Sequence, residues 1–258
     1  MSGIQQQNEK LQGLKSIQMK MLLLTGAIMI LLTAALVGYA SWKIVANAKE
    51  ETMDKLLSTA DSLSDTIYEK IGGELKYLSS LGRRDSINSE KKGKAEVTAF
   101  LAEEAKNTDY LEFDTFNKNG IALSDRRDVT AREYFQQGMK GKATISDLII
   151  NMKDGNSKIF VVSAPIMDGG VPVGVVSGVR QASFVSDFAK NFTYGKTGYV
   201  YILNDKGQIL GHPDQSIVDQ NKTLKELAAA DSGYASFFTA FEQGMQSFAR
   251  PPDWYREI

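Results

Sequence analysis

The sequence predicts an α+β protein in which a membrane helix and a long stalk helix precede a lobe built on an antiparallel sheet and a second, incomplete lobe. Three observations support this fold class. An uncharged apolar run lies near the N-terminus, apolar residues at helical spacing follow it, and short runs rich in Ile and Val alternate with turn sequences farther along the chain. Such runs, joined by short turns, indicate an antiparallel meander.

The composition excludes several classes of protein. The chain has 258 residues, of which 43% are hydrophobic, and this is enough for a normal core in one or two domains. A formal net charge of -1 gives no support for a nucleic-acid partner, because such proteins usually carry a clustered basic surface. The chain has no cysteine and one histidine, so we expect no disulfide, no metal site and no cofactor. Since G-x-S-x-G, H-E-x-x-H and P-loop motifs are absent as well, we do not expect an enzyme.

No residue between Lys20 and Lys43 carries a charge, and as a helix this run would span roughly 33 Å. Tyr39 and Trp42 stand where interfacial aromatic residues are expected. We therefore predict a transmembrane helix at residues 21–42. A cleaved signal peptide is the alternative, but the apolar part of such a peptide is usually only ~7–15 residues long.

The orientation of this span is harder to predict, because lysines flank both of its ends in similar number. A long domain follows the span and is translocated largely regardless of charge. We therefore expect residues 1–20 to be a cytoplasmic tail, and the chain to cross the cell membrane once, with the long domain on the extracytoplasmic side.

Residues 43–83 are predicted to form the stalk helix. Their apolar residues step by three or four positions, the period of a helix with one buried stripe: Leu56, Ala60, Leu63, Ile67, Ile71, Leu75, Leu78 and Leu81. A kink is expected at Gly72-Gly73. Two partners for the stripe stay open, the chain's own lobe or the same stripe of a second copy in a coiled-coil-like homodimer.

We expect the first lobe at residues 84–192. A helix at Ala95–Lys106 carries apolar residues on one face, and the runs Tyr110–Phe116 and Ile121–Leu123 flank a turn, as in a β-hairpin. The meander follows, with strands expected at Thr144–Ile150, Lys158–Ile166 and Val171–Val179.

A short helix is predicted to cover one face of the meander. Thr130 is a suitable N-cap, Tyr134, Phe135 and Met139 recur at helical spacing, and Gly141 ends the helix.

Arg132 stands beside the aromatic residues of this helix. Its planar guanidinium offers two parallel donors and is suited to anchor a ligand carboxylate or phosphate. The alternative is a surface ion pair with Asp128 or Glu133.

The region after Arg180 repeats part of the first lobe. A helical run and two strand-like runs follow in the order Phe184–Phe192, Thr197–Leu203 and Gln208–Leu210. The turn spacing of Asn117–Gly120 recurs at Asn204–Gly207, as a duplicated small sheet would require. We therefore expect a second lobe at residues 193–258. It lacks a meander of its own, which a truncated or frameshifted end would explain.

Three runs carry a resemblance to a known family: D-V-T-x-R-x-Y-F at Asp128–Phe135, P-I-x-x-G-G-x-x-x-G-V-V at Pro165–Val176, and G-K-T-G-Y-V-Y-I-L-N-D-K-G-Q-I-L-G-H-P at Gly195–Pro213. From Lys43 to Ser247 the chain resembles the extracytoplasmic double Cache domain of bacterial transmembrane receptors, chiefly methyl-accepting chemotaxis proteins and also sensor kinases and diguanylate cyclases. The resemblance implies two PAS-like lobes on a long helix, with the ligand in the membrane-distal lobe.

The resemblance also implies site residues. The amino-acid-binding branch of the family carries R-x-W-Y on the pocket helix, where this chain has Arg132, Tyr134 and Phe135. Asn151 falls near another polar pocket position, although a surface turn residue is the alternative.

Two positions depart from that branch. Arg127 stands where the branch has a tyrosine, and Val179 or Arg180, depending on a one-residue register, stands where it has an aspartate. The resemblance therefore implies that the group holding a ligand ammonium is lost, and that the binding residues include Arg180 and accept a small anionic ligand. His212 beside Pro213 is expected to be a loop residue and no metal ligand.

We hypothesise that the chain is the ligand-sensing portion of a bacterial transmembrane chemoreceptor, acting in chemotaxis and signal transduction on a small organic acid or an amino acid-like ligand. The alternatives are the sensor part of a histidine kinase or diguanylate cyclase, and a non-functional membrane-anchored fragment.

Overall fold

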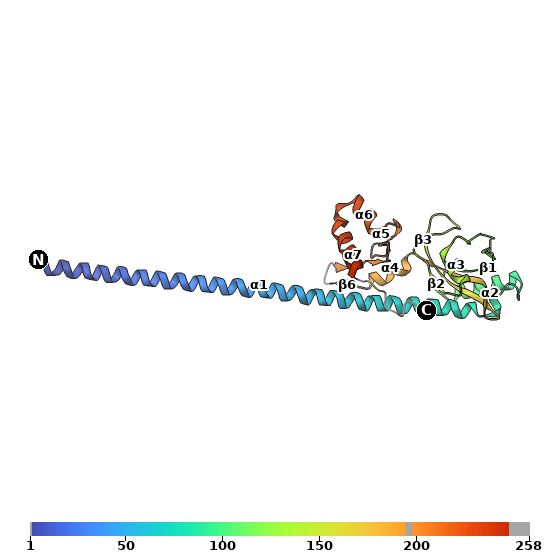
Figure 1. Ribbon diagram of the computed structural model, residues 1–258, viewed down its shortest axis with the longest axis horizontal. Helices are drawn as coiled ribbons and strands as arrows, with labels where there is room; N and C mark the ends of the chain where they lie inside the picture. The colour runs from blue at the N-terminus through green and yellow to red at the C-terminus, as the bar shows by residue number, and fades with distance from the viewer. Residues whose placement is uncertain (1, 195–197, 248–258) are drawn as a thin grey trace. The chain divides into compact units, whose positions relative to one another are not determined.

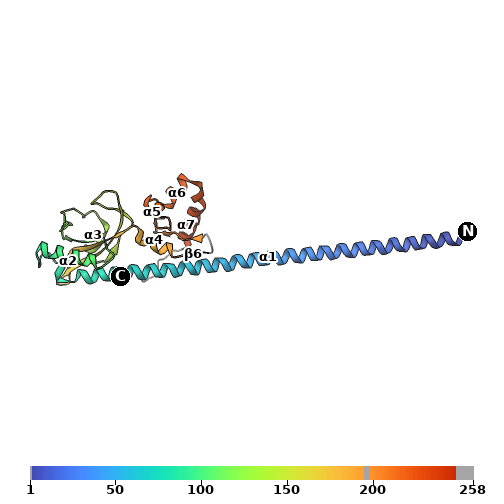
Figure 2. The same ribbon diagram turned by 180° about the vertical axis from the view of Figure 1, so that it is seen from behind.

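The computed structural model describes residues 2–194 and 198–247 (Figure 1). The chain divides into two compact units, residues 1–61 and residues 62–258. Helix α1 (Ser2–Gly82) begins in the first unit and ends in the second. Figure 2 gives the same ribbon from behind, with α1 labelled.

Helix α1 contains the apolar run that the sequence singled out. Within residues 17–82 it is long and apolar enough to cross a membrane, and it is the one described helix that passes this test of length and composition. The side chains of its most apolar part are not covered by other parts of the protein. The helix continues without interruption through Gly72 and Gly73, where the sequence predicted a kink.

The end of the stalk stripe packs on the chain's own lobe. Leu78 and Leu81 are fully buried and share a core with Val176 of the sheet. Leu56, earlier in the stripe, is 40% exposed. The own-lobe alternative is therefore confirmed for the last turns of α1, and the homodimer stays a prediction.

The sheet of the first lobe is antiparallel throughout. Its strands are β1 (Glu112–Asn117), β2 (Thr144–Ile145), β3 (Ile149–Ile150), β4 (Lys158–Asp168) and β5 (Val171–Gln181). The order is β1-β5-β4-β2, and β3 also pairs with β4. The predicted meander is confirmed, with Gly169 and Gly170 in left-handed conformation at the tight β4–β5 turn.

Two predicted strands are shorter than expected. The run Thr144–Ile150 is split into β2 and β3, because Ser146 turns its hydroxyl back to the sheet, where it accepts a hydrogen bond from the backbone N–H of Val161. The run Ile121–Leu123 forms only isolated β-bridges to other residues instead of a continuous strand. The chain reverses direction directly after this run, and the backbone N–H of Ala122 donates to Arg127 O.

Helices cover both faces of this sheet. On one face α1 and α2 (Lys94–Lys106) pack their apolar residues against Val162, Ala164 and Val176. On the other face α3 (Glu133–Met139) packs against Phe116, Val161, Val175 and Val179. Neighbouring residues of β4 and β5 belong to different cores, because successive side chains of a strand point to opposite faces.

Helix α3 begins later than the sequence predicted. Thr130 is not the N-cap, because its backbone N–H and its hydroxyl donate to Asp128 in a turn that precedes the helix. The residue at the N-cap is Arg132. At the other end, Gly141 (φ 85°) and Lys142 donate to the last carbonyl groups of the helix in a Schellman motif.

The described residues from 183 to 247 lie in the same compact unit as the sheet; we call them the second lobe, and they contain short elements joined by turns. They are α4 (Ser183–Lys190), β6 (Thr193–Tyr194), β7 (Gly198–Tyr199), β8 (Ile202–Leu203), β9 (Ile209–Gly211), α5 (Gln215–Asp219), α6 (Leu224–Ala230), the 3-10 helix Ser232–Tyr234 and α7 (Ala235–Ser247). The hairpin β8–β9 lies where the sequence predicted one, and the first residue of its predicted run, Thr197, lies outside the described residues.

The predicted repeat of the turns is confirmed by their hydrogen bonds. The Asn117 side-chain oxygen accepts from the backbone N–H groups two and four positions later, and that of Asn204 does the same. Gly120 and Gly207 close the two turns with φ 73° and 74°. An asparagine that satisfies the turn backbone and a glycine in left-handed conformation therefore account for the spacing.

The segment between β2 and β3 connects the first lobe to the second through hydrogen bonds and buried apolar contacts. Asp147, between β2 and β3, accepts hydrogen bonds from Asn204 Nδ2 at 2.9 Å and from Lys206 Nζ at 2.7 Å. The next residue, Leu148, is buried in the core of the second lobe beside Ile209 and Leu224.

The glycines of α1 provide a test of this packing. A Cβ on Gly82 would lie 2.2 Å from the backbone oxygen of Pro165, whereas a Cβ on Gly72 would meet nothing within 4 Å. We expect Gly82→Ala to lower the free energy of unfolding by about 1–3 kcal/mol, since the backbone must shift. The matched variant Gly72→Ala should raise it by about 0.5–1 kcal/mol. Denaturant titration of the full chain in detergent measures both, and equal effects would contradict the close approach of α1 to β4.

Candidate functional site

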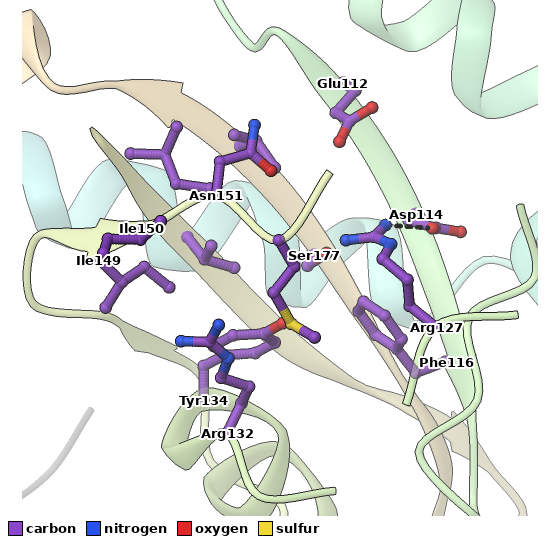
Figure 3. A pocket seen from close by; sticks show the side chains of 14 residues that line it. Glu112, Asp114, Phe116, Arg127, Arg132, Tyr134, Ile149, Ile150, Asn151 and Ser177 are labelled. Atoms are coloured by element: carbon purple, nitrogen blue, oxygen red, sulfur yellow. Dashed lines mark hydrogen bonds and ion pairs between the residues drawn. The ribbon is translucent and has the colours of Figure 1, made fainter. Parts of the chain in front are cut away.

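A small cavity lies on the α3 face of the sheet, between β1, β3, β5 and α3 (Figure 3). It is lined by Glu112, Asp114, Phe116, Arg127, Arg132, Tyr134, Ile149, Ile150, Asn151, Met152, Ile159, Val161, Ser177 and Val179. Its volume of about 20 Å³ is room for about one water molecule. Because an organic ligand is larger, side chains of the lining or the segment after β3 must move when a ligand enters.

Arg132 reaches the cavity from the start of α3. Its side chain is half-buried, and its guanidinium makes no hydrogen bond or ion pair with any residue that the structure describes. The alternative ion pair with Asp128 or Glu133 does not form, and Asp128 instead accepts from Thr130. Arg132 therefore presents an unpaired positive charge to the cavity.

The two aromatic residues after Arg132 lie in different surroundings. Tyr134 is buried and lines the cavity, and burial raises the pKa of its hydroxyl while the charges of Arg132 and Arg127 oppose this shift. Phe135 is 5% exposed and packs edge-on against Phe116 at a centroid distance of 6.4 Å. Phe135 is absent from the cavity lining, so the structure places it in the core below the cavity.

Asn151 combines both roles that the sequence left open. Its backbone N–H donates to Ser157 O, and its side-chain oxygen accepts from Lys153 N, so it organises the turn after β3. It is also half-buried and lines the cavity. Its side-chain amide donor has no partner among the described residues.

Arg180 lies on the opposite face of the sheet and does not line the cavity. Its guanidinium forms a buried ion pair with Glu74 of α1 and stacks over Tyr110 at 4.4 Å and Phe184 at 4.7 Å. Its neighbour Val179 faces the cavity instead. Val179 is thus the residue of this pair that lines the cavity, and β5 directs Arg180 toward α1, so a ligand-binding role of Arg180 stays a prediction that this cavity does not support.

Sequence reasoning missed two carboxylates of the cavity, Glu112 and Asp114. Asp114 is 4% exposed and accepts a hydrogen bond from Arg127 Nη2 at 3.2 Å. Glu112 forms an ion pair with Lys153 of the turn after β3. The alternation in the run Tyr110–Phe116 was a signal for these residues, because it places the two acids on one face of β1.

The charges of the lining favour an anion. Both acids have a cationic partner within the chain, and Arg127 is shared between Asp114 and Asp125. Arg132 is the only charged lining residue whose charged group has no partner among the described residues. A guanidinium in this position can form a charge-assisted pair with a ligand carboxylate.

The described residues contain no group of three or more His, Asp or Glu side chains that could hold a metal ion. His212 is buried, accepts a hydrogen bond from Asp214 N at 2.9 Å, and packs against the rings of Tyr199 and Tyr201. It belongs to the aromatic packing of the second lobe.

Comparison with known sequences points to one family. The sequence model described as Cache domain matches residues 40–253. The methyl-accepting chemotaxis protein McpG of Pseudomonas putida is 25% identical over 218 residues, which are 80% of this chain and 33% of that protein. The methyl-accepting chemotaxis protein PctB of Pseudomonas aeruginosa is 32% identical over 60 residues, 23% of this chain and 10% of that protein. The chain thus spans a third or less of the length of these relatives.

Solved structures show the same fold. The ligand-binding domain of the Pseudomonas fluorescens chemoreceptor CtaA in complex with L-isoleucine has a TM-score of 0.58 at 22% identity, covering 72% of this chain and 78% of that chain. The ligand-binding domain of the Pseudomonas aeruginosa amino acid chemoreceptor PctB in complex with L-Arg has a TM-score of 0.54 at 18% identity, covering 67% and 69%. These similarities confirm the predicted α+β class.

The position of Arg180 leads to a stability prediction. Removing one partner of a buried ion pair leaves the other charge uncompensated, so Arg180→Ala should lower the free energy of unfolding by about 3–5 kcal/mol. Arg84→Ala removes a more exposed arginine, paired with Glu104 at 2.8 Å, and should cost only about 0–1 kcal/mol. Denaturant titration of the full chain in detergent compares them. A cost below 1 kcal/mol for Arg180→Ala would contradict the buried pair with Glu74.

Proposed function

The chain belongs to the Cache domain family, and we propose that it is the extracytoplasmic ligand-sensing part of a bacterial transmembrane chemoreceptor that binds a small organic anion. The observation that carries this proposal is the unpaired guanidinium of Arg132 in a cavity whose other charged groups are matched within the chain. Tyr134 and Asn151 are the other proposed binding residues. The ring of Tyr134 forms an apolar wall of the cavity, and the side-chain amide of Asn151 is a hydrogen-bond donor for the ligand.

The similar receptors support a ligand with a carboxylate. The chemoreceptor domains of CtaA and PctB are described as complexes with L-isoleucine and L-Arg, both of which carry one. In this chain we propose that Arg132 holds the carboxylate. Entry of the ligand enlarges the cavity and so biases the lobe between two arrangements. The chain would then act by binding, without catalysis.

We also propose that residues 21–42 cross the membrane. The apolar part of α1 is not covered by protein, and this distinguishes it from the core helix of a soluble domain. Leu31, for example, is 69% exposed. The exposed stripe beside Leu56 is the proposed contact between two stalks in a homodimer. A histidine kinase or a diguanylate cyclase could use the same sensor with a different output module.

The role of Arg132 can be tested by binding. The full chain in detergent is screened by thermal shift with organic acids, amino acids and amines, and each hit is titrated calorimetrically. Because a charge-assisted hydrogen bond contributes about 1.5–3 kcal/mol, Arg132→Ala should weaken binding about 10- to 100-fold. Lys140→Ala, which removes an exposed positive charge at the other end of α3, is the control and should leave affinity unchanged. Equal affinity of Arg132→Ala and the unmodified chain would place the anchor elsewhere.

The proposed topology can be tested by cysteine labelling, since the natural chain has no cysteine. Asn156→Cys lies in the exposed turn after β3, and Ser2→Cys marks the N-terminal tail. In intact cells a membrane-impermeant maleimide should label Asn156→Cys and should label Ser2→Cys only after permeabilisation. The reverse pattern would place the sensor lobe in the cytoplasm.

A further inference from the structure

We propose that Arg127 makes the cavity selective against ligands that carry an amine. Its guanidinium occupies the side of Asp114 that faces the cavity, where a ligand ammonium would otherwise bind. This inference rests on the proposed function, because it concerns the same cavity, and it identifies a residue that determines specificity.

Asp114 is built to hold a cation. Its side chain is 6% exposed, and the protein fixes its carboxylate through the backbone N–H of Thr115 at 2.9 Å, the backbone N–H of Ser124 at 3.3 Å and the hydroxyl of Ser124. These donors are neutral and independent of Arg127. They position a buried negative charge that still requires a cationic partner.

Arg127 is held in place as that partner. Its Nε donates to Asp125 Oδ2 at 2.6 Å, while its Nη2 reaches Asp114 Oδ2 at 3.2 Å. Its own backbone N–H donates to Asp125 as well, at 3.1 Å. Figure 3 shows its side chain beside Asp114, whereas Arg132 approaches the cavity from α3 on another side. The two arginines therefore differ in function, one compensating an acid of the chain and the other left for a ligand.

The second acid of the cavity is matched as well. Glu112 forms an ion pair with Lys153, whose turn carries the lining residues Asn151 and Met152. A ligand carboxylate can thus pair with Arg132 without breaking an ion pair of the cavity lining. A ligand ammonium must displace Arg127 or Lys153 from its acid, and this displacement lowers its affinity.

The test compares ligands that differ only in the amine: propionate with L-alanine, 4-methylpentanoate with L-leucine, and succinate with L-aspartate. Affinities are measured by calorimetric titration of the full chain in detergent. We expect the unmodified chain to prefer the acid without the amine. Because Arg127→Ala exposes the fixed carboxylate of Asp114 to the cavity, it should shift the ratio of affinities toward the amino acid about 10- to 100-fold.

Three variants control this experiment. Arg126→Ala removes the same charge from an exposed neighbour and should leave the ratio unchanged. Adding Asp114→Asn to Arg127→Ala should abolish the gain, because the acid is lost. If Arg127→Ala does not fold, Arg127→Gln keeps a neutral donor beside Asp114 and should shift the ratio in the same direction.

The outcomes separate this inference from the proposed function. An unchanged ratio in Arg127→Ala, with binding still dependent on Arg132, overturns the inference alone. A preference of the unmodified chain for the amino acids also overturns it. Binding of the amino acids only after Arg127→Ala supports it. If neither the unmodified chain nor Arg127→Ala binds any member of the pairs, the inference and the proposed anionic ligand both fail.

Discussion

The two-residue period of strand β5 separates the cavity from the contact with helix α1. Val179 faces the cavity, and the next residue, Arg180, is buried against Glu74 of α1. A shift of β5 by one residue would exchange these side chains and leave the guanidinium without its carboxylate. The pairing of β5 with both β1 and β4 prevents this shift. One register therefore fixes the wall of the cavity and the attachment of the stalk together.

The segment around β3 gives the cavity a second connection, to the other lobe. Asn151 lines the cavity, and four residues earlier Asp147 accepts hydrogen bonds from Asn204 and Lys206. Leu148, between them, is buried in the core of the second lobe. The cavity is too small for an organic ligand, so a ligand must displace part of its lining. A ligand that displaces β3 moves a segment that is already anchored in the second lobe. Coupling between the ligand and the second lobe requires a physical contact of this kind.

Local patterns made part of this structure predictable. Strands β4 and β5 follow from runs of β-branched residues, and the turns at Asn117 and Asn204 follow from the asparagine and glycine that their backbones require. Pairing between distant segments was not predictable. The alternation in β1 placed Glu112 and Asp114 on one face, but only the pairing of β1 with β5 makes that face a wall of the cavity. The position of Arg180 was not predictable for the same reason, since its neighbours in the sequence do not reveal which face of β5 it occupies.

Burial decides which arginine of the lobe is available to a ligand. Arg180 is almost fully buried, so an unpaired charge there would cost several kcal/mol, and Glu74 compensates it. Arg127 is less buried and is shared between two carboxylates of the chain. Arg132 is half-buried, so water can solvate its charge while no ligand is present. A group that keeps its hydration can exchange that water for a ligand carboxylate without first breaking an ion pair. Among these three arginines, only Arg132 combines access to the cavity with a charge that has no partner in the described part of the chain.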